Sequence, residues 1–304
     1  MTPEVSVIIP THNRRAMLLE AIDSVLAQST PAFELIVIDD GSTDGTGDTL
    51  HLRRLAETIR IERIDHRGPA AARNCGVAIA RAPLVAFLDS DDLWSPTKLE
   101  RQLAFMRDNP GCAISQTGEI WIRNGQRVNP GRRHRKRAGD IFIDSLRTCL
   151  VGMSSVMMRA DLFHSSGGFD EQMTAAEDYD LWLLILIDHE AGLLDEALVT
   201  RRAGHPDQTS ATTPALDRFR ILALTKLLAD DRLSPARRAA VVEVLAEKCR
   251  IYAGGLVRRG RLDEARLYQW VVDRAQAWNT GAAAEIGGAV ESMRSMLREI
   301  PHEC

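Results

Sequence analysis

The sequence predicts an α/β fold, in which a mainly parallel, mixed sheet is flanked by helices and followed by a C-terminal helical region. Apolar, β-branched runs alternate with helical patterns through the first 90 residues, which is the order of a parallel sheet covered by helices. After about residue 211 only helical periodicity remains. Two of the apolar runs end in paired carboxylates, and ligands of such sheets bind at the carboxyl ends of the strands.

The first 90 residues are expected to alternate strictly between strand and helix. Short apolar runs indicate strands, and apolar residues at helical spacing indicate helices. Strands are expected at Val5–Pro10, Phe33–Ile38, Ile59–Ile64 and Leu84–Leu88. Helices are expected at Met17–Leu26, Leu50–Ala56 and Pro69–Ala80.

The middle of the chain has a less regular pattern. Ser95 and Pro96 are expected to cap and open a helix that runs to about Arg107. The other expected elements are strands at 113–122 and 154–158, a basic loop at 129–139, a short helix ending at Gly167 and a helix at 177–187.

The C-terminal third has helical periodicity near 215–230, 235–257, 262–277 and 281–298, with Pro, Gly or Asn-Thr-Gly breaks between the segments. We therefore expect two regions. An α/β domain covers residues 1–210, and a helical region covers residues 211–304.

Composition excludes several classes of protein. A formal net charge of −4 gives no indication of nucleic-acid binding. The five cysteines have no CxxC spacing, so neither a disulfide framework nor a zinc site is expected, and a reduced, cytoplasmic compartment is the simplest interpretation. The longest apolar run, around 181–187, is far shorter than the roughly 20 residues that a spanning helix needs. No secretory signal pattern is present at the N-terminus.

The acidic cluster LDSDD follows the apolar run at 84–88. Asp89 and Asp91 are two residues apart, so in an extended segment their side chains point to one side. Two converging carboxylates repel each other without a counter-cation. Mg²⁺ or Mn²⁺ binds through one or two carboxylates and fills its shell with water and substrate phosphates, so the cluster indicates a metal that carries a diphosphate. Asp92 is either a third ligand or the start of the next turn, and the alternative for the whole cluster is an acidic turn.

A second acidic cluster, VIDDGSTDGT, ends the run at 33–38. It lacks the glycine spacing of a P-loop or of a dinucleotide-binding turn. A carboxylate at Asp39 can accept hydrogen bonds from a base imide or from ribose hydroxyls. Asp40 either does the same or holds the loop through an Asx-turn with Gly41. The alternative is a turn built only from Asp, Gly and Ser.

Three further segments carry candidate residues. PTHNR at 10–14 joins the first strand to a helix N-terminus, which favours anions. Arg73 lies among alanines in GPAAARNCG, which indicates a specific partner, although a lone helical arginine is usually solvated. Glu177 and Asp178 begin a helix in AAEDYDLWLLI, where they are either ordinary N-terminal acids or include a general base.

Six segments taken in order resemble glycosyltransferase family two, the inverting, metal-dependent nucleotide-sugar transferases with the GT-A fold. They are VSVIIPTHNR at 5–14, ELIVIDDGSTDGT at 34–46, GPAAARNCG at 68–76, VAFLDSDDLW at 85–94, SSVMMRADLFHSSGGFDE at 154–171 and EDYDLWLLI at 177–185. The resemblance covers roughly residues 3–210. Each segment is weakly diagnostic alone, whereas all six in this order are highly specific.

The resemblance implies a role for each matching residue. It implies that Asp39 holds the base of the nucleotide. The full set of residues that it implies for nucleotide binding is Pro10, Thr11, Asn13, Arg14, Asp39, Asp40, Arg73, Asp89 and Ser90. It implies that Asp91 is the direct ligand of Mn²⁺ or Mg²⁺. It also implies that His205 in GHPDQTS contacts a phosphate or the metal. It implies Asp178 as the catalytic base, with Asp92, Glu177 and Trp182 in the donor or acceptor pocket. Trp182, flanked by leucines, either lines the acceptor pocket or lies in the core.

The implied reaction moves a sugar from a nucleotide-diphosphate sugar, with UDP favoured, to a hydroxyl of an acceptor glycan or lipid-linked glycan. It is a single, inverting displacement that serves bacterial cell-surface polysaccharide or glycoconjugate synthesis. The basic stretch Arg132–Arg137 either meets anionic headgroups at the inner face of the membrane or a phosphorylated acceptor, or is a solvated loop. The C-terminal helices either form a homodimer, contact a membrane or brace the first domain.

Two other functions stay open. A sugar-phosphate nucleotidyltransferase can share the fold and an acidic metal site, but its glycine-rich, basic first loop is missing from PTHNRRAM. A non-catalytic nucleotide-sugar binding module would not need the Glu177–Asp178 pair.

Overall fold

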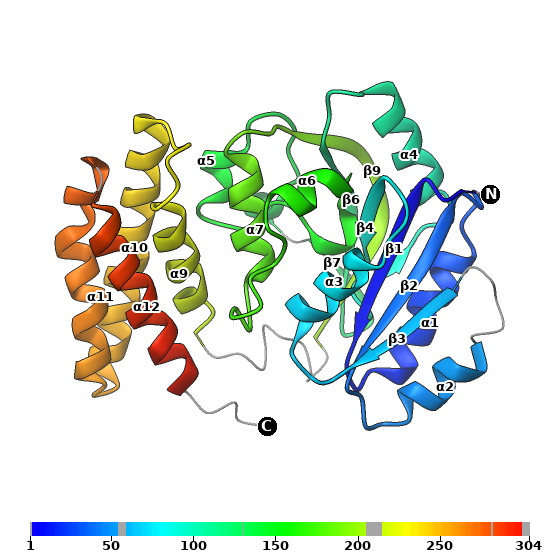
Figure 1. Ribbon diagram of the computed structural model, residues 1–304, viewed down its shortest axis with the longest axis horizontal. Coiled ribbons are helices and arrows are strands. Elements are labelled where there is room, and N and C mark those ends of the chain that lie inside the picture. Colours follow the sequence, from blue (N-terminus) through cyan, green and yellow to red (C-terminus); the bar gives the residue numbers. More distant parts are fainter. Residues whose placement is uncertain (1, 54–58, 130, 205–214, 281, 300–304) are drawn as a thin grey trace.

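The computed structural model describes residues 2–53, 59–129, 131–204, 215–280 and 282–299. Within these residues one mixed sheet has the strand order β3-β2-β1-β4-β8-β6-β9-β5, with β7 paired to β6. A bundle of C-terminal helices stands beside the α/β part (Figure 1). The predicted fold class, a mixed α/β sheet flanked by helices and followed by a helical C-terminal region, is confirmed.

The parallel half of the sheet comes from the first 90 residues, as predicted. Its strands are β1 (Val5–Thr11), β2 (Phe33–Asp40), β3 (Ile59–Ile64) and β4 (Leu84–Phe87), all mutually parallel where they pair. The connecting helices are α1 (Arg15–Leu26), α2 (Thr46–Arg53) and α3 (Pro69–Ala78). Helix α2 begins four residues before the predicted Leu50, because the Asp44 carboxylate accepts the backbone N–H of Thr46 at 3.0 Å and so caps the first turn.

In the other half of the sheet β6 and β9 pair in parallel and the remaining pairs are antiparallel, and here the sequence was less informative. Its strands are β5 (Leu93–Trp94), β6 (Ile114–Arg123), β7 (Gln126–Val128), β8 (Met157–Arg159) and β9 (Ala191–Ala203). Strand β9 was not predicted, because its sequence has no sustained alternation of apolar and polar residues. It pairs with β6 through a bulge at Gly118, where a Cβ atom would lie 2.9 Å from the backbone oxygen of Glu196.

Two predicted boundaries in the middle of the chain are wrong. Helix α4 (Lys98–Asp108) does not begin at Ser95, since the Ser95 N–H donates to the Leu198 carbonyl and prolongs the pairing with β9. The strand predicted at 154–158 begins only at Met157, because residues Met153–Ser155 form a 3₁₀ turn. The remaining helices of this half are α5 (Phe142–Ser145), α6 (Ala160–Ser165) and α7 (Glu177–Leu186).

The C-terminal region is helical, as predicted. Its helices are α9 (Asp217–Leu227), α10 (Pro235–Arg258), α11 (Leu262–Ala275) and α12 (Ala283–Glu299). Ser234 caps α10 by accepting the Arg237 N–H at 3.3 Å, and Pro235 occupies the first turn. None of the described helices combines the length and the apolar character needed to cross a bilayer.

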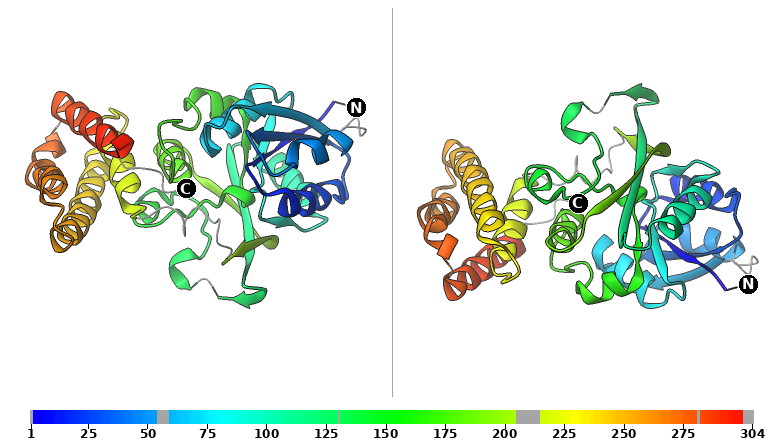
Figure 2. Two further views of the ribbon diagram at one scale, coloured as in Figure 1. Left: turned by 90° about the horizontal axis from the view of Figure 1, so that it is seen from below. Right: turned by 90° about the horizontal axis from the view of Figure 1, so that it is seen from above.

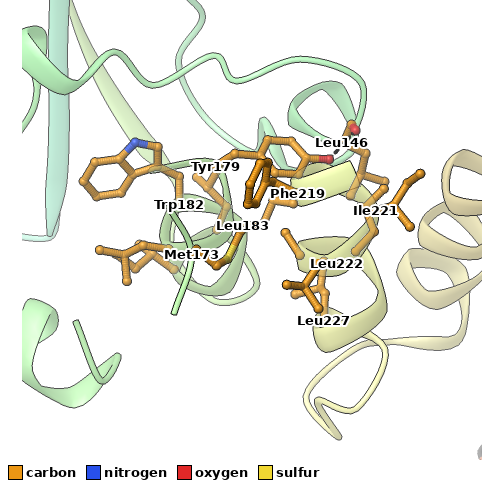
Figure 3. Packing of buried hydrophobic residues seen from close by; sticks show 14 of the residues in the cluster. Leu146, Met173, Tyr179, Trp182, Leu183, Phe219, Ile221, Leu222 and Leu227 are labelled. Atoms are coloured by element: carbon orange, nitrogen blue, oxygen red, sulfur yellow. Dashed lines mark hydrogen bonds between the residues drawn. The ribbon is translucent and has the colours of Figure 1, made fainter. Parts of the chain in front are cut away.

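Helix α9 packs directly against α7, so the bundle shares one apolar core with the α/β part. Tyr179 and Leu183 of α7 meet Phe219 and Leu222 of α9 (Figure 3). The Tyr179 hydroxyl donates to the Leu146 carbonyl at 2.5 Å, which fixes the first turn of α7. The boundary predicted near residue 210 falls within 205–214, outside the described residues. Figure 2 shows the bundle to one side of the sheet and the β6–β7 hairpin projecting from the α/β part.

Candidate active site

A cavity of about 940 Å³ lies at the carboxyl ends of β1, β2 and β4. Twelve of the residues singled out from the sequence line it. They are Pro10, Thr11, Asn13, Arg14, Asp40, Arg73, Asp89, Ser90, Asp91, Asp92, Glu177 and Asp178. Segments up to 168 residues apart in sequence therefore meet at one place, as the parallel order of β1, β2 and β4 leads us to expect.

Of the three other expected site residues, two do not line the cavity and one lies outside the described residues. Trp182 is 2 % exposed and packs edge-on against Phe169 in the core, so an acceptor-pocket role for its side chain is corrected to a core role. Asp39 lies behind the cavity lining and is 1 % exposed. His205 lies outside the described residues.

Asp89, Asp91 and Asp92 form a carboxylate cluster whose oxygen atoms lie within 4.8 Å of one another. Burial, together with the charges of Asp91 and Asp89, raises the pKa of Asp92 well above its ordinary value. A divalent cation would relieve this repulsion, and carboxylate oxygens are the protein donors that Mg²⁺ and Mn²⁺ prefer. The residues present therefore fit the expected metal.

The three carboxylates also have different protein partners. Asp92 accepts the Ser154 hydroxyl at 2.6 Å and the Arg202 N–H at 2.9 Å, so both of its oxygens tie neighbouring segments together. Asp91 accepts Arg14 Nη1 at 2.9 Å. Asp92 is thus the structural member of the cluster, which leaves Asp89 and Asp91 as the better candidates for the metal.

Arg73 joins the carboxylate cluster to the start of α7. Its Nη2 donates to Asp89 at 2.8 Å and its Nη1 donates to Glu177 at 2.6 Å. Burial raises the pKa of Glu177, and the Arg73 charge opposes that rise. The specific partner expected for Arg73 is therefore a pair of carboxylates, and the arginine lies where it also faces the cavity.

The backbone at the start of α7 is held in an unusual conformation. Ala176 has φ +56°, in the left-handed region that alanine rarely adopts. This residue directs the chain into α7, so that Glu177 reaches Arg73 and Asp178 lines the cavity. The Cys149 thiol donates a hydrogen bond to Asp178 Oδ2, with 3.6 Å between the sulfur and the oxygen. Burial and the Asp178 charge raise the pKa of Cys149 well above its ordinary value.

The end of the cavity near β1 and β2 is built from two interlocked loops. Asn13 has φ +51°, and its side-chain oxygen accepts the Thr43 N–H at 2.7 Å. Asp39 Oδ1 accepts the Ser42 N–H at 2.9 Å, whereas its Oδ2 is buried without a hydrogen-bond partner among the described residues and lies 3.7 Å from Arg63 Nη1 in an ion pair. Arg63 offsets part of the charge, but a buried acceptor without a hydrogen bond is still costly, and a base imide would supply the missing donor.

Asp40 holds the loop that precedes α3. Its carboxylate accepts the backbone N–H groups of Arg67 and Gly68, both at 2.8 Å, and contacts His66 Nδ1 at 2.8 Å. The loop-holding alternative therefore applies to Asp40, although it acts on residues 66–68 and not on Gly41. The His66 ring stacks on His12 at 3.9 Å, and sequence reasoning singled out neither histidine.

The opposite end of the cavity is basic, and it combines part of the basic stretch Arg132–Arg137, which was singled out from the sequence, with Arg201 and Arg220, which were not. Lys136 pairs with Glu119 at 2.8 Å, and Arg201 lies over the Trp121 ring at 4.8 Å. Burial lowers the pKa of Arg201, but the charges of Glu119 and Asp92 outweigh this and raise it. Arg133, His134 and Arg220 also line this end. The solvated-loop interpretation of 132–137 thus does not hold for Lys136, while Arg201 was missed because β9 was not predicted.

Comparison with known proteins agrees with this geometry. Residues 6–163 match the profile of glycosyl transferase family 2. The chain belongs to glycosyl transferase family 2. The sequence reasoning that led to this family from six ordered segments is confirmed.

Relatives of the chain come from several bacteria. A putative teichuronic acid biosynthesis glycosyltransferase, TuaG, of Bacillus subtilis is 46 % identical over 159 residues, which cover 51 % of this chain and 62 % of TuaG. The Escherichia coli protein WfgD, described as a UDP-Glc:alpha-D-GlcNAc-diphosphoundecaprenol beta-1,3-glucosyltransferase, is 32 % identical over 63 % of this chain and 73 % of its own length. An uncharacterized glycosyltransferase of Rickettsia felis is 37 % identical over 64 % of this chain, but the match spans only 32 % of that protein.

Solved structures support the fold. S. aureus TarS 1–349 in complex with UDP-GlcNAc has a TM-score of 0.72 and 20 % sequence identity, with 98 % of this chain and 92 % of that chain covered. A mannosyltransferase from Pyrobaculum calidifontis in complex with GDP-Man and Mn²⁺ has a TM-score of 0.60 and 18 % identity, with 98 % and 89 % covered. The likeness extends over nearly the whole chain and so includes the helical region.

Proposed function

We propose that the protein is an inverting glycosyltransferase that moves a sugar from a UDP-sugar to a hydroxyl of a lipid-linked glycan, at the cytoplasmic face of a bacterial membrane. The observation that carries the proposal is the sharing of one cavity by the Asp89–Asp92 carboxylate cluster, Arg73 and Asp178. The names of WfgD and TuaG support a role in cell-surface glycan synthesis.

The donor would occupy the cavity from the β1–β2 end toward the carboxylate cluster. The buried Asp39 Oδ2 would accept the imide N–H of the base, close to Thr11, whose hydroxyl is also buried without a hydrogen-bond partner among the described residues. Asp89 and Asp91 would hold Mn²⁺ or Mg²⁺, which supplies positive charge to the diphosphate when it is bound. His205 stays a proposed phosphate or metal contact.

Asp178 would act as the base. Its carboxylate is on the cavity wall, and the Cys149 thiol and the Tyr179 N–H donate to its two oxygens, which hold it in one orientation. It would take the proton of the acceptor hydroxyl as that oxygen attacks the sugar. Arg73 and Arg201 place positive charge on the same cavity, where negative charge develops on the leaving diphosphate. A single displacement then inverts the anomeric centre.

The first test is a thermal-shift panel of UDP, GDP, dTDP and CDP with and without Mn²⁺. We expect UDP with Mn²⁺ to raise the melting temperature most, because a ligand that binds the folded state stabilises it. The absence of metal-dependent stabilisation by every nucleotide would reject the transferase proposal.

The second test separates catalysis from binding. Asp178→Asn is expected to abolish sugar transfer to a lipid-linked acceptor while the stabilisation by UDP and Mn²⁺ is retained. Retained transfer would show that another group is the base. A variant that binds no UDP would show that Asp178 has been misassigned, and an unmodified protein that binds the donor without transferring it would favour the binding module.

A further inference from the structure

We propose that the end of the bundle at the α10–α11 turn binds the surface of an anionic phospholipid bilayer. The surface consists of the exposed side chains of Arg250, Ile251, Val257, Arg258, Arg259 and Leu262, and we call it the α10–α11 tip. The inference goes beyond the proposed function, because lipid binding at this tip needs neither donor nor acceptor.

Exposed apolar side chains are concentrated at the tip. Among the described residues, six large apolar side chains are exposed, and three of the six lie within the twelve residues from 251 to 262. Ile251 is 63 % exposed, and Val257 and Leu262 are each 53 % exposed. Burying such side chains at the boundary between headgroups and acyl chains removes apolar surface from water.

The same surface is basic. Arg250, Arg258 and Arg259 are exposed, and within the described chain none of the three forms an ion pair with a carboxylate. The two arginines that follow are different, because Arg261 pairs with Glu264 and Arg266 pairs with Asp263 at 3.0 Å. Unpaired guanidinium groups beside exposed apolar side chains are complementary to an anionic bilayer, which offers phosphate charge above hydrocarbon.

A depression at the tip provides room for a lipid headgroup. Its volume is about 310 Å³, and Arg220, Ile251, Arg258 and Arg259 are among the residues that line it. Asp217 also lines it, and its carboxylate accepts Lys248 Nζ at 3.1 Å and Arg220 Nη1 at 3.3 Å. The depression therefore offers the positive charges of Arg258 and Arg259, with which no carboxylate of the described residues pairs.

The tip lies next to the catalytic cavity. Leu216 and Arg220 line both the 310 Å³ depression and the 940 Å³ cavity. In Figure 1 the α10–α11 turn is at the lower end of the bundle, the end toward which β1 and β2 run. A bilayer on the tip would face the basic end of the cavity, where an acceptor carried by a lipid would enter.

The test measures sedimentation of the full chain with phosphatidylcholine vesicles, with and without 30 % phosphatidylglycerol. We expect binding only to the anionic vesicles and weaker binding as salt is raised. Each basic side chain near such a surface raises the binding constant about five-fold. Arg258→Gln/Arg259→Gln should therefore weaken binding by roughly 25-fold, and Ile251→Ser should weaken it without changing the charge.

Matched variants identify the surface. Arg101→Gln/Arg107→Gln removes two exposed arginines from α4 and should bind as the unmodified protein does. Arg132→Gln/Arg135→Gln tests the basic loop. The proposal is overturned if the unmodified protein does not prefer anionic vesicles, if the tip variants bind normally, or if only the loop variant loses binding.

Two measurements on the same samples separate lipid binding at the tip from dimerisation and from damage to the donor site. Light scattering reports whether the tip forms a homodimer, and a dimer that Ile251→Ser dissociates would replace the lipid by a second copy of the chain. Thermal shift with UDP and Mn²⁺ tests the proposed function independently, because no tip side chain lines the catalytic cavity in the described residues. Loss of lipid binding with normal UDP binding in the variants is the expected result.

Discussion

Arg73 is the residue whose replacement tests the architecture of the site most directly. It is 6 % exposed and is held between Glu177, whose side chain is 9 % exposed, and Asp89, whose side chain is 31 % exposed. Arg73→Met keeps a long, unbranched side chain and removes the charge. Water can cover Asp89 in the variant, but it has little access to Glu177.

The expected loss follows from that difference. Removing one partner of a buried ion pair costs about 3–5 kcal/mol, because the remaining charge is left without a partner. We assign nearly all of this to Glu177 and expect Arg73→Met to lower the free energy of unfolding by about 3–4 kcal/mol. Adding Glu177→Gln should restore about 2 kcal/mol, since the buried charge is then gone.

Urea unfolding at pH 7, followed by tryptophan fluorescence, measures these differences. The matched control is Arg107→Met, whose arginine is 61 % exposed and 3.4 Å from Glu4, and a loss of less than about 1 kcal/mol is expected there. The reasoning is refuted if Arg73→Met costs no more than the control, or if Glu177→Gln adds a further loss to that of Arg73→Met.

Three further predictions concern the core and the start of α7. Lys98 is fully buried 3.6 Å from the Trp94 ring centroid without a hydrogen-bond partner for Nζ among the described residues, and burial lowers its pKa well below 10.5. Lys98→Met should therefore raise the free energy of unfolding by about 1–3 kcal/mol at pH 7. The gain should shrink toward pH 10.5, where half of this lysine is deprotonated in the unfolded chain as well; urea melts at pH 7 and 10 check both parts. Ala176→Gly should raise that free energy by about 1 kcal/mol, because glycine adopts positive φ without strain, and a lower melting temperature would contradict this. Methylthiolation of Cys149 should be slow because its pKa is raised, and it should block transfer by adding bulk beside Asp178. Cys149→Ala should resist the reagent and should slow transfer only modestly, because the Tyr179 N–H still holds the other oxygen of Asp178.

Local sequence patterns were sufficient for much of the fold. The β-α-β order of the first 90 residues and the C-terminal helices could be predicted, because a strand buried on both faces and an amphipathic helix each leave a periodic apolar pattern. Strand β9 could not be predicted, because it pairs with β6 through a bulge. The bulge at Gly118 depends on contact with a segment almost 80 residues away.

Within the site, the sequence by itself determined which chemical groups are present and at which strand ends they lie. Asp89 and Asp91 were singled out in this way, since acidic residues at strand ends are visible in the chain, whereas the role expected of Asp178 came from the family resemblance. Only the tertiary structure decided their partners. In the folded protein Arg73 binds two carboxylates, Asp40 accepts hydrogen bonds from the 66–68 loop, and Arg201 lines the cavity. The physical reason is that hydrogen bonds and burial depend on distances between segments far apart in sequence, which no local pattern records.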